Sequence, residues 1–146
     1  VEEAFICGLL HDIGKIMLLR VDAQTYSNIL EIHDEGNMMM WEKTVFGYDH
    51  SQAGALVARA WRLPEYICDS ILIHHNASQA MHSSFIAHLI VAADTVSNFY
   101  GYGLRLEEEG ALSGMESAII LNLSEEQLHE AWNNIQDSLQ EVINSF

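Results

Sequence analysis

The residues best suited to chemistry lie in two adjacent pairs, His11-Asp12 and His74-His75, each next to an apolar stretch. The first pair belongs to the segment Gly8–Lys15, which reads GLLHDIGK and brings imidazole, carboxylate and amine together. A helix that is apolar on nearly every side is a buried helix, and a charge inside it costs free energy unless it is paired or bound to a metal. Adjacent helical residues diverge by roughly 100°, so this first pair can flank an ion beside the helix. The alternative is a buried His–Asp hydrogen bond between two helices.

Two further residues extend the set of candidates. His50 lies in the first turn of a helix predicted to begin at Asp49, with Gln52 placed for a capping box. The positive end of that helix favours the neutral imidazole, which is the form that binds metals. Asp94 follows Ile90 by four residues in an apolar helix, so we expect it to be buried and to share cations with the first aspartate. The candidate metal ligands are His11, Asp12, His50, His74, His75 and Asp94.

The donor atoms of this set restrict the metal. Imidazole and carboxylate together suit Fe, Mn, Zn or Ni and are a poor match for Ca or for a thiolate cluster. Two such ions roughly 4 Å apart would activate a water molecule and clamp a phosphate ester. We therefore expect one or two divalent transition-metal ions. The alternative is that the histidines are hydrogen-bonded core residues and that no metal binds.

Helical periodicity covers most of the chain and predicts an all-α fold. A first helix is expected over about 2–19, with an inward face made by Phe5, Leu9, Asp12 and Ile16. Asp22 is expected to cap the next helix. The helix that follows Asp49 carries apolar residues at helical spacing, namely Ala53, Leu56, Val57, Ala60 and Trp61. A last amphipathic helix over about 125–144 either packs on the core or forms a homo-oligomer contact.

Composition restricts the class of protein. The chain has 146 residues, enough for one domain spanning 1–146, and a formal charge of −15. With 21 acidic and 6 basic residues it cannot neutralise many phosphates, which argues against a nucleic-acid or anionic-membrane partner. Two cysteines in apolar patterns indicate a reducing, cytoplasmic setting. The start lacks Met and enters an apolar helix at once, so we expect a fragment of a longer protein.

The motifs resemble those of a known superfamily. The segment Gly8–Lys15 resembles the HD motif of the HD phosphohydrolases. Glu42 followed by Phe46–Gly54, which reads FGYDHSQAG, resembles a block of HDOD proteins, the HD-related output domains of bacterial signalling. The sequences WRLP at 61–64, ILIHH at 71–75 and Ala93-Asp94 continue the pattern in order, so that the resemblance covers about Phe5 to Gly101. It implies a helical bundle of about six to eight helices.

The resemblance also implies roles for single residues. His11 and Asp12 match the HD metal ligands, and Asp94 matches the final aspartate. His50, His74 and His75 match extra histidines that hold further metal in the related HD-GYP phosphodiesterases. Lys15 matches a lysine that faces the substrate phosphate. The superfamily's first ligand, an upstream His, would lie before Val1, and His74-His75-Asn76 is not followed by the Gly-Tyr-Pro signature.

Two functions follow from these observations. The first is a regulatory HDOD domain that acts through a signalling protein or another domain of the same protein, with a structural or vestigial metal site. The second is a metal-dependent phosphohydrolase acting on a nucleotide or cyclic dinucleotide. In that case Asp12 and Lys15 are the catalytic candidates, because Asp12 would bridge the ions and Lys15 would stabilise the developing charge.

Overall fold

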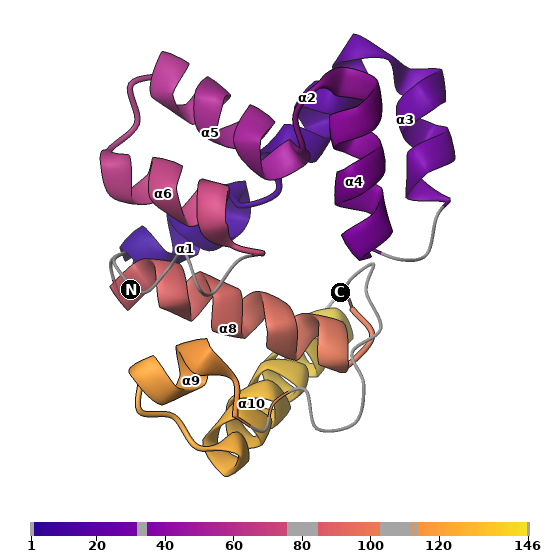
Figure 1. Ribbon diagram of the computed structural model, residues 1–146. Coiled ribbons are helices and arrows are strands. Elements are labelled where there is room, and N and C mark those ends of the chain that lie inside the picture. The colour runs from indigo at the N-terminus through magenta and orange to yellow at the C-terminus, as the bar shows by residue number, and fades with distance from the viewer. Residues whose placement is uncertain (1, 32–34, 76–84, 103–111, 113, 146) are drawn as a thin grey trace.

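The computed structural model describes residues 2–31, 35–75, 85–102, 112 and 114–145, and in these ranges helices joined by turns and loops are the only regular secondary structure, as predicted. No helix in this part of the chain is long and apolar enough to cross a membrane. The helices, labelled as in Figure 1, are α1 (Glu2–Leu10), α2 (Ile13–Val21), α3 (Ala23–Leu30), α4 (Glu35–Phe46), α5 (His50–Ala60), α6 (Glu65–Ile73), α8 (Phe85–Phe99), α9 (Glu116–Ile120) and α10 (Glu125–Asn144).

The prediction of one continuous helix over 2–19 is wrong, because the chain breaks at His11 and Asp12. The Nδ1–H of His11 donates to the carbonyl of Gly8 at 2.6 Å, which takes the acceptor that a continuous helix would offer to the N–H of Asp12. Asp12 becomes the N-cap of α2, but its side chain makes no capping hydrogen bond. Because the Asp12 carboxylate does not bind the first N–H groups of α2, it can point away from the helix.

The predicted inward face of the first helix is also wrong. Phe5 and Leu9 are each 70 % exposed and Ile16 is 52 % exposed, and the buried residue of α1 is Cys7, so another face of α1 packs on the core. Of the apolar residues spaced after Asp49, Ala53 is buried but Leu56 and Trp61 are exposed, and the buried positions of α5 carry mostly small residues. Small residues are needed there because α5 packs closely against both α2 and α6.

Two glycines allow α2 and α5 to cross in backbone contact. A Cβ added at Gly14 would lie 1.8 Å from the carbonyl oxygen of His50 and 2.7 Å from the nitrogen of Gly54. A Cβ at Gly54 would meet a methyl of Ile71 at 2.8 Å. Only glycine fits such an approach. The crossing fixes the start of α2, which follows Asp12, against the start of α5, which is His50.

Helix caps set where the site-bearing helices begin. Asp49 accepts from the backbone N–H of Gln52 at 2.8 Å, and the Gln52 side chain accepts from the N–H of Asp49 at 3.1 Å, which completes the predicted capping box. Asp22 caps α3 through the N–H of Thr25 at 3.0 Å, also as predicted. Gly47, with φ of +84°, turns the chain between α4 and α5.

Helix α8 runs through the middle of the molecule (Figure 1). On one side it packs against α1 and α6, and on the other against α9. Ile90 of α8 belongs to a buried apolar cluster with Cys7, Ala55 and Ile71, all from the N-terminal helices. A separate cluster lies on the C-terminal side and consists of Val96, Leu112, Ala118, Leu128 and Trp132.

Candidate metal centre

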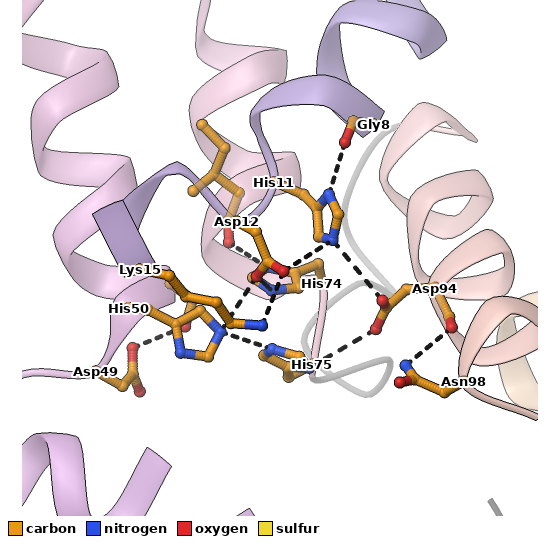
Figure 2. Close-up of polar contacts among 12 residues, drawn as sticks. Gly8, His11, Asp12, Lys15, Asp49, His50, His74, His75, Asp94 and Asn98 are labelled. Atoms are coloured by element: carbon orange, nitrogen blue, oxygen red, sulfur yellow. Dashed lines mark hydrogen bonds and ion pairs between the residues drawn. The ribbon is translucent and has the colours of Figure 1, made fainter. Parts of the chain in front are cut away.

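Four of the predicted ligands converge on one point (Figure 2). Asp12 comes from the break between α1 and α2, His50 is the first residue of α5, and His74 and His75 directly follow α6. Each offers one ligand atom, and these atoms all lie within 4.8 Å of one another. His50 and His74 are completely buried at their side chains. The arrangement supplies three imidazole nitrogens and one carboxylate oxygen.

Neighbouring acceptors fix the orientation of two of these imidazoles. The Nδ1 of His74 lies 2.6 Å from the carbonyl oxygen of Ile71, which can only accept, so Nδ1 carries the hydrogen. The Nδ1 of His50 lies 2.7 Å from a carboxylate oxygen of Glu42, and it donates there in the same way. In neutral histidine the second ring nitrogen then carries a lone pair. Both Nε2 atoms are therefore acceptors that face the centre of the cluster.

The lone pair of His74 meets another acceptor rather than a donor, whereas that of His50 also faces the Nε2 of His75. The Oδ1 atom of Asp12 lies 3.4 Å from the Nε2 of His74 and 3.6 Å from the Nε2 of His50. Asp12 Oδ1 and His74 Nε2 are both buried and neither makes a hydrogen bond. A buried polar atom without a partner is costly, and three converging lone pairs are stabilised by a cation. The residues therefore fit a divalent metal of the kind that nitrogen and oxygen donors bind.

The contact between His50 and His75 supports the same conclusion. Their Nε2 atoms are 2.7 Å apart. Ligand atoms that share one ion at about 2.1 Å are about 3.0–3.4 Å apart, so a small separation of the two rings would admit the ion. Burial, together with the neighbouring His74 and His50, lowers the pKa of His75 to about 2. His75 is thus held in the neutral form that binds metals.

His11 and Asp94 lie beside this group of four rather than within it. The Nε2 of His11 is 3.5 Å from Asp12 Oδ2 and 3.7 Å from Asp94 Oδ1. The other oxygen of Asp94 is 3.9 Å from the Nδ1 of His75. Asp12 thus faces His50 and His74 with one oxygen and His11 with the other (Figure 2). Their assignment as ligands stays a prediction.

The charges around Asp12 suit an ionised carboxylate. Burial would raise the pKa of Asp12, but the Lys15 ammonium, 2.8 Å away, outweighs burial and holds that pKa well below its usual range. Burial would also lower the pKa of His11, but the carboxylates of Asp94 and Asp12 reverse the direction and raise it. Carboxylates outnumber ammonium groups here, which favours a bound cation.

Sequence reasoning assigned no role to Glu42, and the structure places it behind His50. Its carboxylate is completely buried, and it accepts from the Nδ1–H and the backbone N–H of His50 and from the hydroxyl of Tyr26. A glutamate between Trp41 and Lys43, eight residues before the histidine, gives no sign of this contact by spacing alone. Within the sequence it stood out only as part of the resemblance to HDOD proteins.

A cavity of about 350 Å³ opens beside the cluster. Its polar wall consists of His11, Asp12 and Asp94, with Ser97 further along α8. Ile90 and Ala93 form part of its apolar wall, and Tyr102, which is 67 % exposed, stands at its side. A small molecule can therefore approach the oxygen of Asp12 that faces His11.

Comparison with known proteins identifies the family of the chain. The model of the HDOD domain matches residues 1–77, slightly more than half of the chain. An uncharacterized protein of Treponema pallidum (strain Nichols) is 29 % identical over 82 residues, which cover 55 % of this chain and 16 % of that protein. The chain thus corresponds to a small part of that relative's length. No solved structure matches it. Asp94 lies beyond the matched residues, whereas the four converging residues lie within them. Because the match covers more than half of the chain, the chain belongs to the HDOD domain family.

Proposed function

We propose that this chain is a regulatory signalling domain that holds a divalent transition metal at Asp12, His50, His74 and His75. The observation that carries the proposal is the convergence of acceptor atoms at the site, two of which are buried without a hydrogen bond. Fe, Mn, Zn and Ni are the ions that this donor set favours. The family match supports the regulatory part of the proposal.

Exposed apolar residues support a role in protein contacts. Phe5 and Leu9 are one helical turn apart on α1 and both are largely exposed. Ile135 and Ile143, on α10, are 50 % and 65 % exposed. Exposed apolar patches on a folded domain often mark interaction surfaces. The proposed partner is a signalling protein or another domain of the same protein at α1, and a second copy of the chain at α10.

A second candidate function is metal-dependent phosphoester hydrolysis. The cavity beside His11, Asp12 and Asp94 favours it, since a small molecule can enter there. When bound, the metal would supply Lewis-acid activation of water and of the phosphate ester. Lys15 ion-pairs with Asp12 at 2.8 Å in the structure, and in this proposal its ammonium would bind a phosphate oxygen. Burial keeps His75 neutral, so it serves as a ligand rather than as a proton donor.

The experiment that tests metal binding is elemental mass spectrometry of protein purified without chelators. The wild type is compared with Asp12→Ala and with Asp137→Ala, a matched change at an exposed aspartate on α10. We expect one to two equivalents of Fe, Mn, Zn or Ni in the wild type and in Asp137→Ala, and a clear loss in Asp12→Ala. Absence of metal from all three proteins, even after reconstitution, would contradict the proposal.

The same proteins separate regulation from catalysis. The metal-loaded wild type is assayed against phosphomonoesters, nucleotides and cyclic dinucleotides. The regulatory proposal expects no turnover above that of Asp12→Ala. Robust phosphodiesterase turnover that disappears in Asp12→Ala would overturn it and establish the second candidate.

A further inference from the structure

We propose that Glu42 is a positioning residue for the metal centre and that Tyr26 holds it in place. Glu42 fixes His50 in the tautomer that carries its hydrogen on Nδ1, so that the Nε2 lone pair faces Asp12 and His75. The inference rests on the proposed metal site and deepens it, because it names residues outside the ligand set that decide how well the ion binds.

Both carboxylate oxygens of Glu42 accept hydrogen bonds. Its Oε2 accepts from the backbone N–H of His50 at 2.8 Å and from the Nδ1–H of the same residue at 2.7 Å. Its Oε1 accepts from the Tyr26 hydroxyl at 2.8 Å. The glutamate side chain is completely buried, and Tyr26 is 1 % exposed. Three donors on one desolvated carboxylate offset the cost of burying it and leave it little freedom to turn.

The tautomer matters because the alternative would close the site. If His50 carried its hydrogen on Nε2, that N–H would point to the Nε2 of His75, 2.7 Å away, and no lone pair of His50 would face the cluster. The same hydrogen would occupy the side of the ring that must coordinate the ion. Glu42 excludes this arrangement by demanding the hydrogen at Nδ1. It thereby keeps a lone pair of His50 directed at the centre, where Asp12 Oδ1 and His74 Nε2 already lack a hydrogen-bond partner.

The same contacts connect the metal site to helices that contribute no ligand. Tyr26 lies on α3 and packs in a buried cluster with Leu18, Ile29 and Met38, whereas Glu42 lies on α4. Carboxylates that orient a metal-bound histidine in this way typically change metal affinity by 10–100-fold when they are removed. The packing of α3 on α4 therefore affects metal binding through two hydrogen bonds, from Tyr26 to Glu42 and from His50 to Glu42.

The first measurement is the tautomer of His50 in metal-free protein. Nitrogen-15 NMR of the imidazoles, at mildly alkaline pH where imidazole is neutral, distinguishes a hydrogen on Nδ1 from one on Nε2. We expect Nδ1–H in the wild type and in Glu42→Gln, whose amide oxygen can still accept. We expect Nε2–H to become populated in Glu42→Leu. An unchanged tautomer in folded Glu42→Leu would overturn the inference, and so would Nε2–H in the wild type.

The second measurement is the affinity for Co²⁺, by competition with a chromophoric chelator and from the visible spectrum of the complex. We expect Glu42→Leu to weaken binding by about 100-fold, Glu42→Gln by about tenfold and Tyr26→Phe by a few-fold. Glu65→Gln and Tyr48→Phe are matched changes at solvent-accessible positions and should leave the affinity unchanged. Circular dichroism melts confirm folding of each variant. If Glu42→Leu fails to fold, the other two variants decide the result.

The outcomes separate this inference from the proposed function. If the wild type binds no Co²⁺, the metal site itself is refuted, while the tautomer measurement still tests the role of Glu42. If the wild type binds Co²⁺ and Glu42→Gln, Glu42→Leu and Tyr26→Phe all bind it equally well with the same spectrum, the metal site stands and the positioning role is refuted.

Discussion

The crossing of α2 and α5 makes Gly14→Ala a severe test of the structure. The added Cβ would lie 1.8 Å from the carbonyl oxygen of His50, so the two helices must move apart by about 1.6 Å to reach an ordinary contact of 3.4 Å. Overpacking a core costs about 1–3 kcal/mol where side chains can adjust, and here the obstacle is backbone. We therefore expect a loss of at least about 3 kcal/mol in the free energy of unfolding.

The same displacement should disturb the metal centre. Asp12 lies two residues before Gly14, and His50 is the residue that the new Cβ would strike. Metal–ligand distances tolerate about ±0.2 Å, far less than the movement required. Any variant that stays folded should therefore retain little metal.

Gly8→Ala is the matched control for this prediction. A Cβ at Gly8 would meet only a methyl of Ile90, at 3.8 Å, which is an ordinary contact. Alanine is favoured over glycine inside a helix by about 0.5–1 kcal/mol, so Gly8→Ala should be neutral or stabilising. Urea unfolding gives the stabilities and elemental mass spectrometry gives the metal content. Equal stability and equal metal content in the two variants would refute the close crossing.

Three further predictions concern other parts of the chain. Arg62 has a φ of +59°, a left-handed conformation that costs a non-glycine residue about 1 kcal/mol. Arg62→Gly should therefore raise the melting temperature measured by calorimetry by a few degrees. A lower melting temperature would contradict the left-handed backbone at residue 62. Burial alone would raise the pKa of Asp49, but Lys43 and the capping hydrogen bonds lower this pKa. The ionised carboxylate therefore contributes stability above its ordinary pKa near 3.9, and this contribution is lost as the pH falls through the lowered pKa. Asp49→Asn should therefore flatten the acid side of the stability profile measured by urea unfolding, and a profile parallel to that of the wild type would count against the assignment. Lys15→Met removes the ammonium that lies 2.8 Å from the carboxylate of Asp12. The affinity for Co²⁺ should therefore rise by about tenfold, while any phosphodiesterase turnover falls. Weaker Co²⁺ binding would mean that Lys15 supports the site structurally.

The convergence of Asp12, His50, His74 and His75 was largely predictable, because residue type and spacing carry the signal. His50 could be placed from the capping box at Asp49 and Gln52, which the structure confirms. The pair His74-His75 follows an apolar run, and its position after α6 leaves both rings at the cluster. These are local features, so the sequence shows them without knowledge of the tertiary fold.

The break in the first helix was not predictable in this way. It depends on the hydrogen bond that the His11 side chain donates to the carbonyl of Gly8, and helical periodicity does not predict this bond. Phe5 and Leu9 are exposed because α1 turns the face that carries Cys7 toward the core. The contact of Glu42 with His50 was not predictable for a related reason, since His50 lies on the next helix and only the packing of α4 and α5 brings the two residues together.

The position of α8 between two separate apolar clusters has a consequence for how the domain unfolds. The four converging ligands belong to the side that contains Cys7, Ile71 and Ile90, whereas α9 and α10 are held by the cluster around Val96 and Trp132. Proteins open locally in cooperative units that follow such divisions. Helices α9 and α10 can therefore detach as one unit and exchange their amide hydrogens with solvent, while the half that contains Asp12, His50, His74 and His75 keeps its native packing.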